Sequence, residues 1–474
     1  MSKSLKIILF AVSGFVGLLV LIALALLLFV DANAYKPRLE VAASGALGME
    51  VKVDGQLGIG FFPDLLLTLK DVHIRNRGAD LASANEARLG IDLLPLLHEE
   101  VRIRNISLIH PAISIEQDRD GKFNFEKPET TGGTLPTLDL ANVSLSDGAL
   151  LYTEKKSGDG FEFGECRLDV RHLQLAGGGS PDLMKKLAIT AKIACGKFKT
   201  KDFAASDLKF SVMGKDGVFD LKPVTMEVFG KQGSGNIQAD FSGAVPLYHF
   251  HYAMQQFRIE EFFKNLSPNK VAEGSMDFSA NLTMHGKTVS EMKQSAAGDI
   301  SLRGKNLTLK GTDLDQEFAR FESSQNFNLV DVGAFFFIGP VGLAVTKGYN
   351  FASIFKESGG SSEIRKLVSD WKVERGVAHA QDVAMATNKN RITLQGGLDF
   401  VNERFDDVTI TLIDAKGCAT VRQKIRGPFQ KPVVEKPNIL ISLLGPALKL
   451  LKKGMNLISG GKCEVIYAGS VAPP

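Results

Sequence analysis

The stretch LLLTLKDVHIR, residues 65–75, places apolar and polar side chains alternately along the chain. Strict alternation is the pattern of a β-strand with one apolar face and one polar face. The pattern recurs along most of the chain, for example at residues 101–104, 113–116, 392–400 and 408–413. Strands with one face suited to water are typical of antiparallel sheets, so the sequence predicts a mainly β fold.

A short unit repeats at the start of several predicted strands: Asp or Asn, an aliphatic residue, any residue, then Ile, Leu or Met. It occurs at residues 71–74, 105–108, 142–145, 306–309 and 382–385. A recurring unit without a fixed period favours an elongated, curled antiparallel sheet, a β-groove, built strand by strand. The alternative is chance, because such tetrads are common in any β-rich chain.

Helical patterns are few. Short helices are predicted at residues 290–295, 313–323 and 363–370. A longer amphipathic helix is predicted at residues 438–458, where Leu440, Leu444 and Leu451 share one stripe. This helix would cover the last edge of the sheet or lie at a membrane surface.

The N-terminal region contains an unbroken run of 24 apolar or small residues, positions 7–30. Its length suits a helix that spans a bilayer. Residues 1–6 then form a cytoplasmic tip with Lys3 and Lys6, and the bulk of the chain lies outside the cytoplasm. The alternative is a cleaved secretory signal ending near residues 32–34.

Composition shifts divide the rest of the chain. We predict an N-terminal β module at residues 31–126, a linker rich in Pro, Gly and Thr at 127–138, an extended groove region at 139–436, and a helix with a tail at 437–474. The formal net charge is +3 with no long run of one sign, which argues against a nucleic-acid partner.

All four cysteines, Cys166, Cys195, Cys418 and Cys463, follow the predicted anchor and form two local groups. In an oxidising compartment they permit two disulfides, Cys166–Cys195 and Cys418–Cys463. The alternative is four buried thiols.

No residue pattern indicates catalysis, a metal centre or a cofactor, so we expect a protein that is not an enzyme. The glycines of residues 158–164 lie between strands and indicate a turn. His249 and His251 would share one strand face, but no third ligand is near them in the sequence.

The segment 31–125 resembles the N-terminal module of the AsmA family. The residues that carry the resemblance come in order: Asp31, Tyr35-Lys36-Pro37, Leu39-Glu40, Gly48-Met49-Glu50-Val51, Asp54-Gly55, Leu57, Pro63, Leu69-Lys70-Asp71-Val72, Ile74, Asn76, Leu93-Leu94-Pro95-Leu96, Val101, Ile103, Pro111, Ile113, Asp118-Arg119-Asp120-Gly121 and Asn124-Phe125. The C-terminal part is also similar, in Gly417-Cys418, Gly427, Lys462-Cys463, Tyr467 and Gly469-Ser470-Val471.

The resemblance implies a single-pass inner-membrane protein with its bulk in the periplasm, similar to chorein-type bridge proteins that hold acyl chains in a hydrophobic groove. We therefore expect a protein that binds or conveys lipid and supports outer-membrane assembly and lipid homeostasis. Its expected partners are phospholipid or another envelope lipid, the inner membrane and other envelope proteins. Candidate groove-lining residues are Phe161, Phe163, Ile237 and Phe241. The alternative is a scaffold or assembly factor for outer-membrane proteins whose β core is closed.

Overall fold

The fold is given by a computed structural model. The residues it describes are 32–60, 65–76, 78–92, 103–125, 138–156, 158, 160–175, 183–200, 204–264, 272–311, 313–324, 360–435, 438–439 and 465–474. The chain divides into two compact units, Met1–Gly217 and Val218–Pro474, here called unit 1 and unit 2. The division falls inside the region that the sequence predicts as one groove. The predicted linker lies almost wholly outside the described residues.

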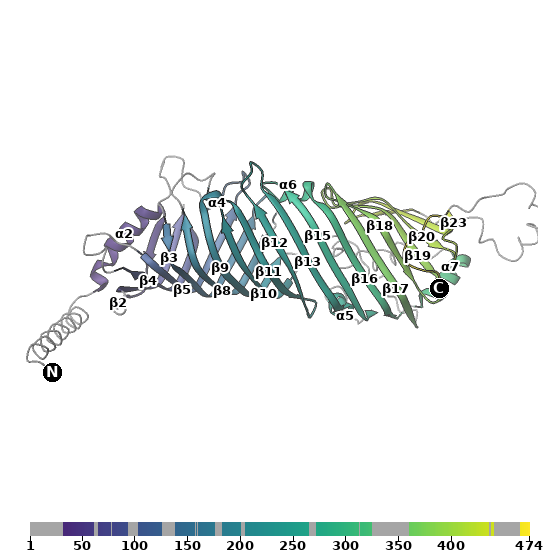
Figure 1. Ribbon diagram of the computed structural model, residues 1–474, viewed down its shortest axis with the longest axis horizontal. Coiled ribbons are helices and arrows are strands. Elements are labelled where there is room, and N and C mark those ends of the chain that lie inside the picture. The colour runs from purple at the N-terminus through teal and green to yellow at the C-terminus, as the bar shows by residue number, and fades with distance from the viewer. Residues whose placement is uncertain are drawn as a thin grey trace, which may run out of the picture. The chain divides into compact units, whose positions relative to one another are not determined.

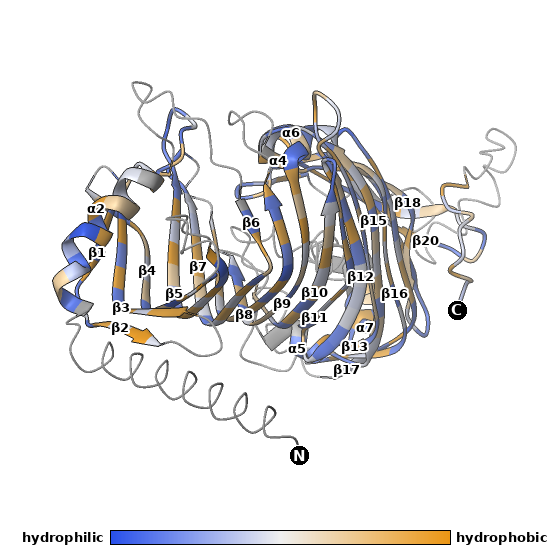
Figure 2. Ribbon diagram, turned by 60° about the vertical axis from the view of Figure 1, so that its left-hand side comes forward, coloured by the Kyte–Doolittle hydropathy of each residue, from blue (hydrophilic) through white to orange (hydrophobic). Residues whose placement is uncertain are grey.

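Both units are built mainly from long strands, which confirms the prediction of a mainly β fold (Figure 1). The elements of unit 1 are η1 (Ala32–Tyr35), α2 (Lys36–Leu47), β1 (Glu50–Val53), β2 (Leu57–Gly60), β3 (Leu65–Asn76), β4 (Ala79–Ile91), β5 (Ile103–Gln117), β6 (Leu138–Leu140), β7 (Asn142–Glu154), β8 (Gly160–Leu175), α4 (Leu183–Lys186), β9 (Leu187–Thr200) and β10 (Ala204–Lys215). Polar and apolar residues alternate along these strands, as the colours of Figure 2 show.

The sheet of unit 1 follows the order of the sequence. Strands β1 and β2 both pair with β3, and β4, β5, β7, β8, β9 and β10 follow in turn. All of these pairs are antiparallel except β5–β7, which is parallel. Two of the repeated tetrads begin opposite each other in this parallel pair, where Asn142 Nδ2 donates to Asn105 Oδ1 at 3.1 Å.

A row of left-handed residues crosses the unit 1 sheet. Five non-glycine residues within its strands have φ between 49° and 55°, and each is passed over in the pairing of its strand with a neighbour. They are Asp71, His110, Asp147, Glu165 and Asp207. The residues opposite are passed over as well, so the register is unchanged at Asp71, His110, Glu165 and Asp207, and it shifts beside Asp147 in the β7–β8 pair. A left-handed residue interrupts the alternation, so later side chains of its strand point to the face opposite to the one that alternation predicts.

Helix α2 covers the first edge of the unit 1 sheet (Figure 1). Three outward amides of the short edge strands and the turn after them are satisfied by helix-side acceptors: Val51 N–H by Ser44 Oγ, Val53 N–H by Glu40 Oε1 and Leu57 N–H by Asn33 Oδ1, all at 2.8–2.9 Å. Leu39 packs on the core cluster Val53, Leu57, Leu69 and Ala87. Because an unpaired edge invites pairing with other chains, these contacts protect it.

The elements of unit 2 are β11 (Val218–Val228), β12 (Lys231–Asp240), β13 (Leu247–Arg258), α5 (Ile259–Lys264), β14 (Ala272–Glu273), β15 (Ser275–His285), α6 (Val289–Ser295), β16 (Ala297–Lys310), α7 (Leu314–Ser324), β17 (Ser361–Glu374), β18 (Val377–Ala386), β19 (Arg391–Asp399), β20 (Arg404–Ile413), β21 (Ala419–Pro428), β22 (Val433–Val434) and β23 (Asn438–Ile439). Neighbouring strands pair antiparallel throughout the described part of this unit.

The helix predicted at residues 363–370 is wrong, because this segment belongs to strand β17. Ile364, Leu367, Val368 and Trp371 recur at the three- and four-residue spacing of a helix. In the structure all four are buried because both faces of β17 are covered, so side chains on opposite faces are apolar. The helices predicted at 290–295 and 313–323 are confirmed as α6 and α7.

The C-terminal tail, residues 465–474, packs on strands β17–β20. Tyr467 and Val471 join a buried cluster with Val368, Ala384 and Ile413. The guanidinium of Arg391, a residue only 5% exposed, donates to the Val471 and Asp414 carbonyls at 2.9 and 3.0 Å and lies 5.5 Å from the Tyr467 ring centre. The tail thereby completes the core of the last strands.

Asp382 fixes the tail from the opposite side. It accepts hydrogen bonds from the Tyr467 hydroxyl at 2.6 Å and the Ser470 amide at 3.0 Å. Burial alone would raise the pKa of the Asp382 carboxyl, but these hydrogen bonds outweigh it and hold the pKa below its usual range.

We predict that the tail loosens in acid. A carboxyl whose pKa is lowered by folding stabilises the fold above its unfolded pKa of about 4, and this stabilisation is lost as pH falls through the lower, folded pKa. The protection factors of the amides of residues 467–471, which correct for the slower intrinsic exchange in acid, should therefore fall below about pH 4. In the variant Asp382→Asn these protection factors should depend much less on pH, and equal profiles for both proteins would refute the assignment.

Of the predicted helix at 438–458, Asn438 and Ile439 instead form the short strand β23, which pairs with β21 because it continues the ladder. The remaining residues, 440–458, lie outside the described residues. No helix in the described part of the chain is long and apolar enough to span a bilayer. The predicted anchor, residues 7–30, lies outside that part.

Candidate apolar binding site

An apolar cavity of about 270 Å³ lies on the unit 1 sheet, over strands β5, β7, β8, β9 and β10. Its exposed lining is entirely apolar. The large side chains around it are Ile113, Leu145, Leu150, Phe163, Leu168, Ile193 and Phe210. A concave apolar site of this size suits a part of an apolar ligand, such as a segment of an acyl chain.

The side chains around the cavity are not packed shut. Leu145, Phe163 and Ile193 are half-buried. In unit 2, by contrast, Ile392 and Ile410 on strands β19 and β20 are at most 1% exposed. Covering exposed apolar surface yields about 25 cal/mol per Å², so the unit 1 face offers a gain that the filled core of β17–β20 does not.

An aromatic ladder continues from the cavity toward the strand ends. Ring centres are 4.8 Å apart for Phe163–Phe198, 5.3 Å for Phe161–Phe163 and 4.9 Å for Tyr152–Phe161. At its far end the Tyr152 hydroxyl donates to Gln117 Oε1 at 3.0 Å. The ladder thus leads from a wholly apolar interior to a polar group at the end of β7.

The four candidate groove-lining residues fall into two clusters. Phe161 and Phe163 stand in the aromatic ladder of unit 1, and only Phe163 lines the cavity. Ile237 lies in unit 2 in register with Leu221 and Phe250. Phe241 packs edge-on against Phe219 and Tyr248, with ring centres 5.7 and 5.9 Å away.

Sequence reasoning missed most of the cavity: Ile113, Leu145, Leu150, Ile193 and Phe210 were not among the candidates. The signal that identifies them is a change in phase: after certain residues, the apolar side chains move from odd to even positions of the strand, or the reverse. Along β8, Phe161 and Phe163 face the same side as Cys166 and Leu168, because the left-handed Glu165 lies between the two pairs. A polar residue that interrupts alternation, followed by alternation in the opposite phase, marks such a position.

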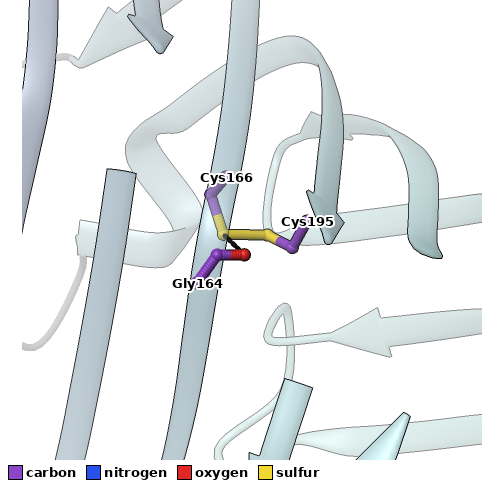
Figure 3. Close-up of a disulfide and its surroundings, with 3 residues drawn as sticks. All are labelled: Gly164, Cys166 and Cys195. Atoms are coloured by element: carbon purple, nitrogen blue, oxygen red, sulfur yellow. Dashed lines mark hydrogen bonds between the residues drawn. A yellow bond between two sulfur atoms is a disulfide. The ribbon is translucent and has the colours of Figure 1, made fainter. Parts of the chain in front are cut away.

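A disulfide lies in the wall of this cavity. Cys166 and Cys195 are opposite each other in the β8–β9 pair, with Cα atoms 4.0 Å apart and sulfur atoms 2.11 Å apart (Figure 3). The Cys166 sulfur also lies 3.8 Å from the Gly164 carbonyl oxygen. The bridge ties together the two central strands of the site.

Removal of this bridge should destabilise unit 1. For a sequence separation of 29 residues, the Cys166→Ala/Cys195→Ala variant should lose about 3.6 kcal/mol of unfolding free energy on the chain-entropy model. Denaturant unfolding followed by near-ultraviolet circular dichroism measures the loss. An unchanged midpoint would show that the bridge contributes nothing, and peptide mapping of unreduced protein after alkylation checks that it forms.

The second predicted bridge involves a residue outside the described part of the chain, Cys463, so it stays a prediction. Its partner Cys418 is 9% exposed, and its backbone pairs with Val465. The described tail therefore passes beside Cys418.

The histidine pair lies on the polar face of unit 2. His249 is opposite Gln238 and Thr283, and His251 is opposite Asn236 and Asn281. A hollow of about 350 Å³ lies here, lined by Asp220, Lys222, Asn236, Ile237, Gln238, His249, Phe250, His251 and Asn281. His249 Nδ1 lies 3.2 Å from Thr283 Oγ1.

One group of potential cation ligands also lies close together in the described residues: Asp54, Asp71 and His73. His73 Nε2 is 3.2 Å from Asp71 and 3.9 Å from Asp54. Both carboxylates are about 60% exposed, with side-chain values of 59% and 61%, so ordinary solvation and the ion pairs account for them.

The sequence was compared with known proteins. No match was found among curated proteins or among solved structures. The model of the AsmA family matches residues 1–170 and 173–334, which is more than half of the chain and reaches into both units. With the strand-built fold and the open apolar face, this match assigns the family: the chain belongs to the AsmA family.

Proposed function

We propose that this protein binds lipid acyl chains on the apolar face of its sheet and thereby supports lipid handling in the cell envelope. The observation that carries the proposal is the apolar cavity of unit 1, whose large lining side chains are half-buried. Membership of the AsmA family supports an envelope-associated role.

The energetics favour an acyl chain as the ligand. Each CH₂ group that leaves water gains about 0.8 kcal/mol, so a short segment of chain in the cavity suffices for measurable binding. Arg167 borders the cavity without exposing a polar atom to it, so the exposed lining offers no hydrogen-bond donor to a polar ligand. Headgroups would lie toward the strand ends, near the Tyr152 hydroxyl and Gln117.

We also propose that residues 7–30 anchor the protein in the inner membrane and that the described units lie in the periplasm. Support comes from the length of the apolar run and from the disulfide, which requires an oxidising compartment. This location gives the apolar face direct access to membrane lipid.

Native mass spectrometry of the full chain, released from mild detergent, tests the lipid proposal. We expect adducts with phospholipid masses. A photoreactive residue in place of Phe163 should in addition form covalent lipid adducts in intact membranes. Lipid-free protein together with no adduct at position 163 would exclude the proposed function.

A second function has support in unit 2. Strands β17–β20 each contain a run of neighbouring buried residues, so both faces are covered there, and the tail and α7 provide further buried residues, Val471, Leu314 and Phe318. A filled core of this kind suits a scaffold or assembly factor for other envelope proteins. Under that reading, protein partners rather than lipids would crosslink to the unit 1 face.

A further inference from the structure

Helix α2 has two distinct faces. The side chains of Leu39, Glu40 and Ser44 contact the sheet, as described above. The opposite face carries Arg38, Val41 and Ala42, and Tyr35, the last residue of η1 and the N-cap of α2, continues it; these residues recur at spacings of three and four and are all exposed. Tyr35 is 53% exposed and Val41 is 74% exposed.

The chemistry of this outer face is unusual for a surface in water. It has an aromatic residue, an aliphatic residue, one cation and no acid. Glu40, the only acidic residue of α2, is turned to the β1 amide of Val53. Tyr and Arg are the residues that suit the boundary between headgroups and acyl chains, since each pairs an apolar stem with a polar end.

The distance along the chain limits where this face lies. Only four residues lie between Val30, the end of the apolar run, and Tyr35. Fully extended, the five steps from Val30 to Tyr35 span about 18 Å at most, and Ala32–Tyr35 form a 3₁₀ turn, which shortens the span. The exposed face of α2 is therefore held close to the surface of the membrane in which residues 7–30 would be anchored.

We propose that the outer face of α2 binds the bilayer surface, with Tyr35 and Val41 among the headgroups and outer acyl carbons and Arg38 on lipid phosphate. The inference rests on the anchor proposed above. It gives α2 two roles: its inner face closes the sheet edge, and its outer face holds that edge against the membrane. The first strands of unit 1 then meet lipid at the membrane surface.

The test places a photoreactive residue at Val41 in the full chain, in native membranes. The matched control is Val289 on α6 of unit 2, which is 56% exposed. We expect lipid adducts at position 41 at a yield at least about tenfold above position 289, corresponding to about 1.4 kcal/mol of preferential contact. Arg38→Glu should lower the yield at position 41 because it repels anionic headgroups.

Equal yields at positions 41 and 289 would overturn the proposal. Equal yields could also arise if residues 7–30 do not anchor the protein. Extraction of the membranes with alkaline carbonate checks this, since a protein that remains in the membrane pellet is anchored. The photoreactive residue at position 163 distinguishes failure of the α2 proposal from failure of the proposed lipid-binding function. Adducts at position 163 but not at position 41 would leave that function standing and remove the docking of α2.

Discussion

The variant Ile193→Asp is expected to co-purify with at least about tenfold less phospholipid than the unchanged protein. Ile193 lines the apolar cavity from the central strand β9. An aspartate there would be desolvated by an acyl chain without any partner for its charge, and the cost of burying an unpaired carboxylate far exceeds the 1.4 kcal/mol that a tenfold loss requires. Native mass spectrometry of the full chain measures the loss.

The matched control is Ala194→Asp, the next residue on the same strand. Ala194 faces the other side of the sheet, opposite Arg167 and Lys209, so a carboxylate there is solvated and lies near positive charge. The control should keep its lipid. Equal losses in both variants, or lipid retained in Ile193→Asp, would contradict the binding site. Thermal unfolding of both proteins identifies a variant that has failed to fold, and Ile193→Ala then provides a milder change at the same position.

The second large effect is expected at the C-terminal tail. Arg391→Ala should lower the unfolding free energy of unit 2 by about 3 kcal/mol or more, because two charge-assisted hydrogen bonds are lost and the Val471 and Asp414 carbonyls are left without these donors. The change also removes the cation from the Tyr467 ring. Denaturant unfolding followed by the fluorescence of Trp371, the only tryptophan, reports on this part of the fold.

Arg365→Ala is the control for this experiment, since Arg365 is an exposed arginine on β17 of the same sheet. Its effect should stay within about 0.5 kcal/mol. If the two variants unfold alike, the tail does not depend on Arg391. Limited proteolysis adds a local measure, because the residues after position 465 should be cut sooner in Arg391→Ala only.

The sequence was sufficient for the class of fold because alternation is a local property. Each long strand shows it, and most strands of the structure coincide with a predicted alternating segment. The prediction from alternation failed where a second layer of residues covers the sheet. In β17 residues on both faces are buried, so its apolar residues recur at the spacing of a helix. No local pattern distinguishes such a strand from a helix. Helix α2 was missed for a related reason, since its apolar stripe is narrow and much of its contact with the sheet is polar.

The candidate site was predicted less well than the fold. Phe163 was identified, but the remaining cavity depends on which residues share a face across five strands. That arrangement depends on where the alternation changes face, which it does at the left-handed residues Asp147, Glu165 and Asp207. The role of the tail could not be predicted either, because Tyr467 contacts Asp382 and Arg391, residues more than 70 positions earlier in the chain.

The row of left-handed residues across unit 1 has a consequence for how such a chain tolerates insertions and deletions. Leu145 and Leu150 line the same cavity although they are five positions apart, an odd number, because the left-handed Asp147 lies between them. Deletion of Asp147 itself would leave the two leucines on one face, since uniform alternation over four positions returns to the same side, whereas deletion of another residue of β7 would turn every side chain beyond it to the other face. Single-residue length changes in these strands are therefore tolerated best at the left-handed position. A strand added to this sheet during evolution would need the same change of face at the same level, so the sheet can lengthen by whole strands more readily than by single residues.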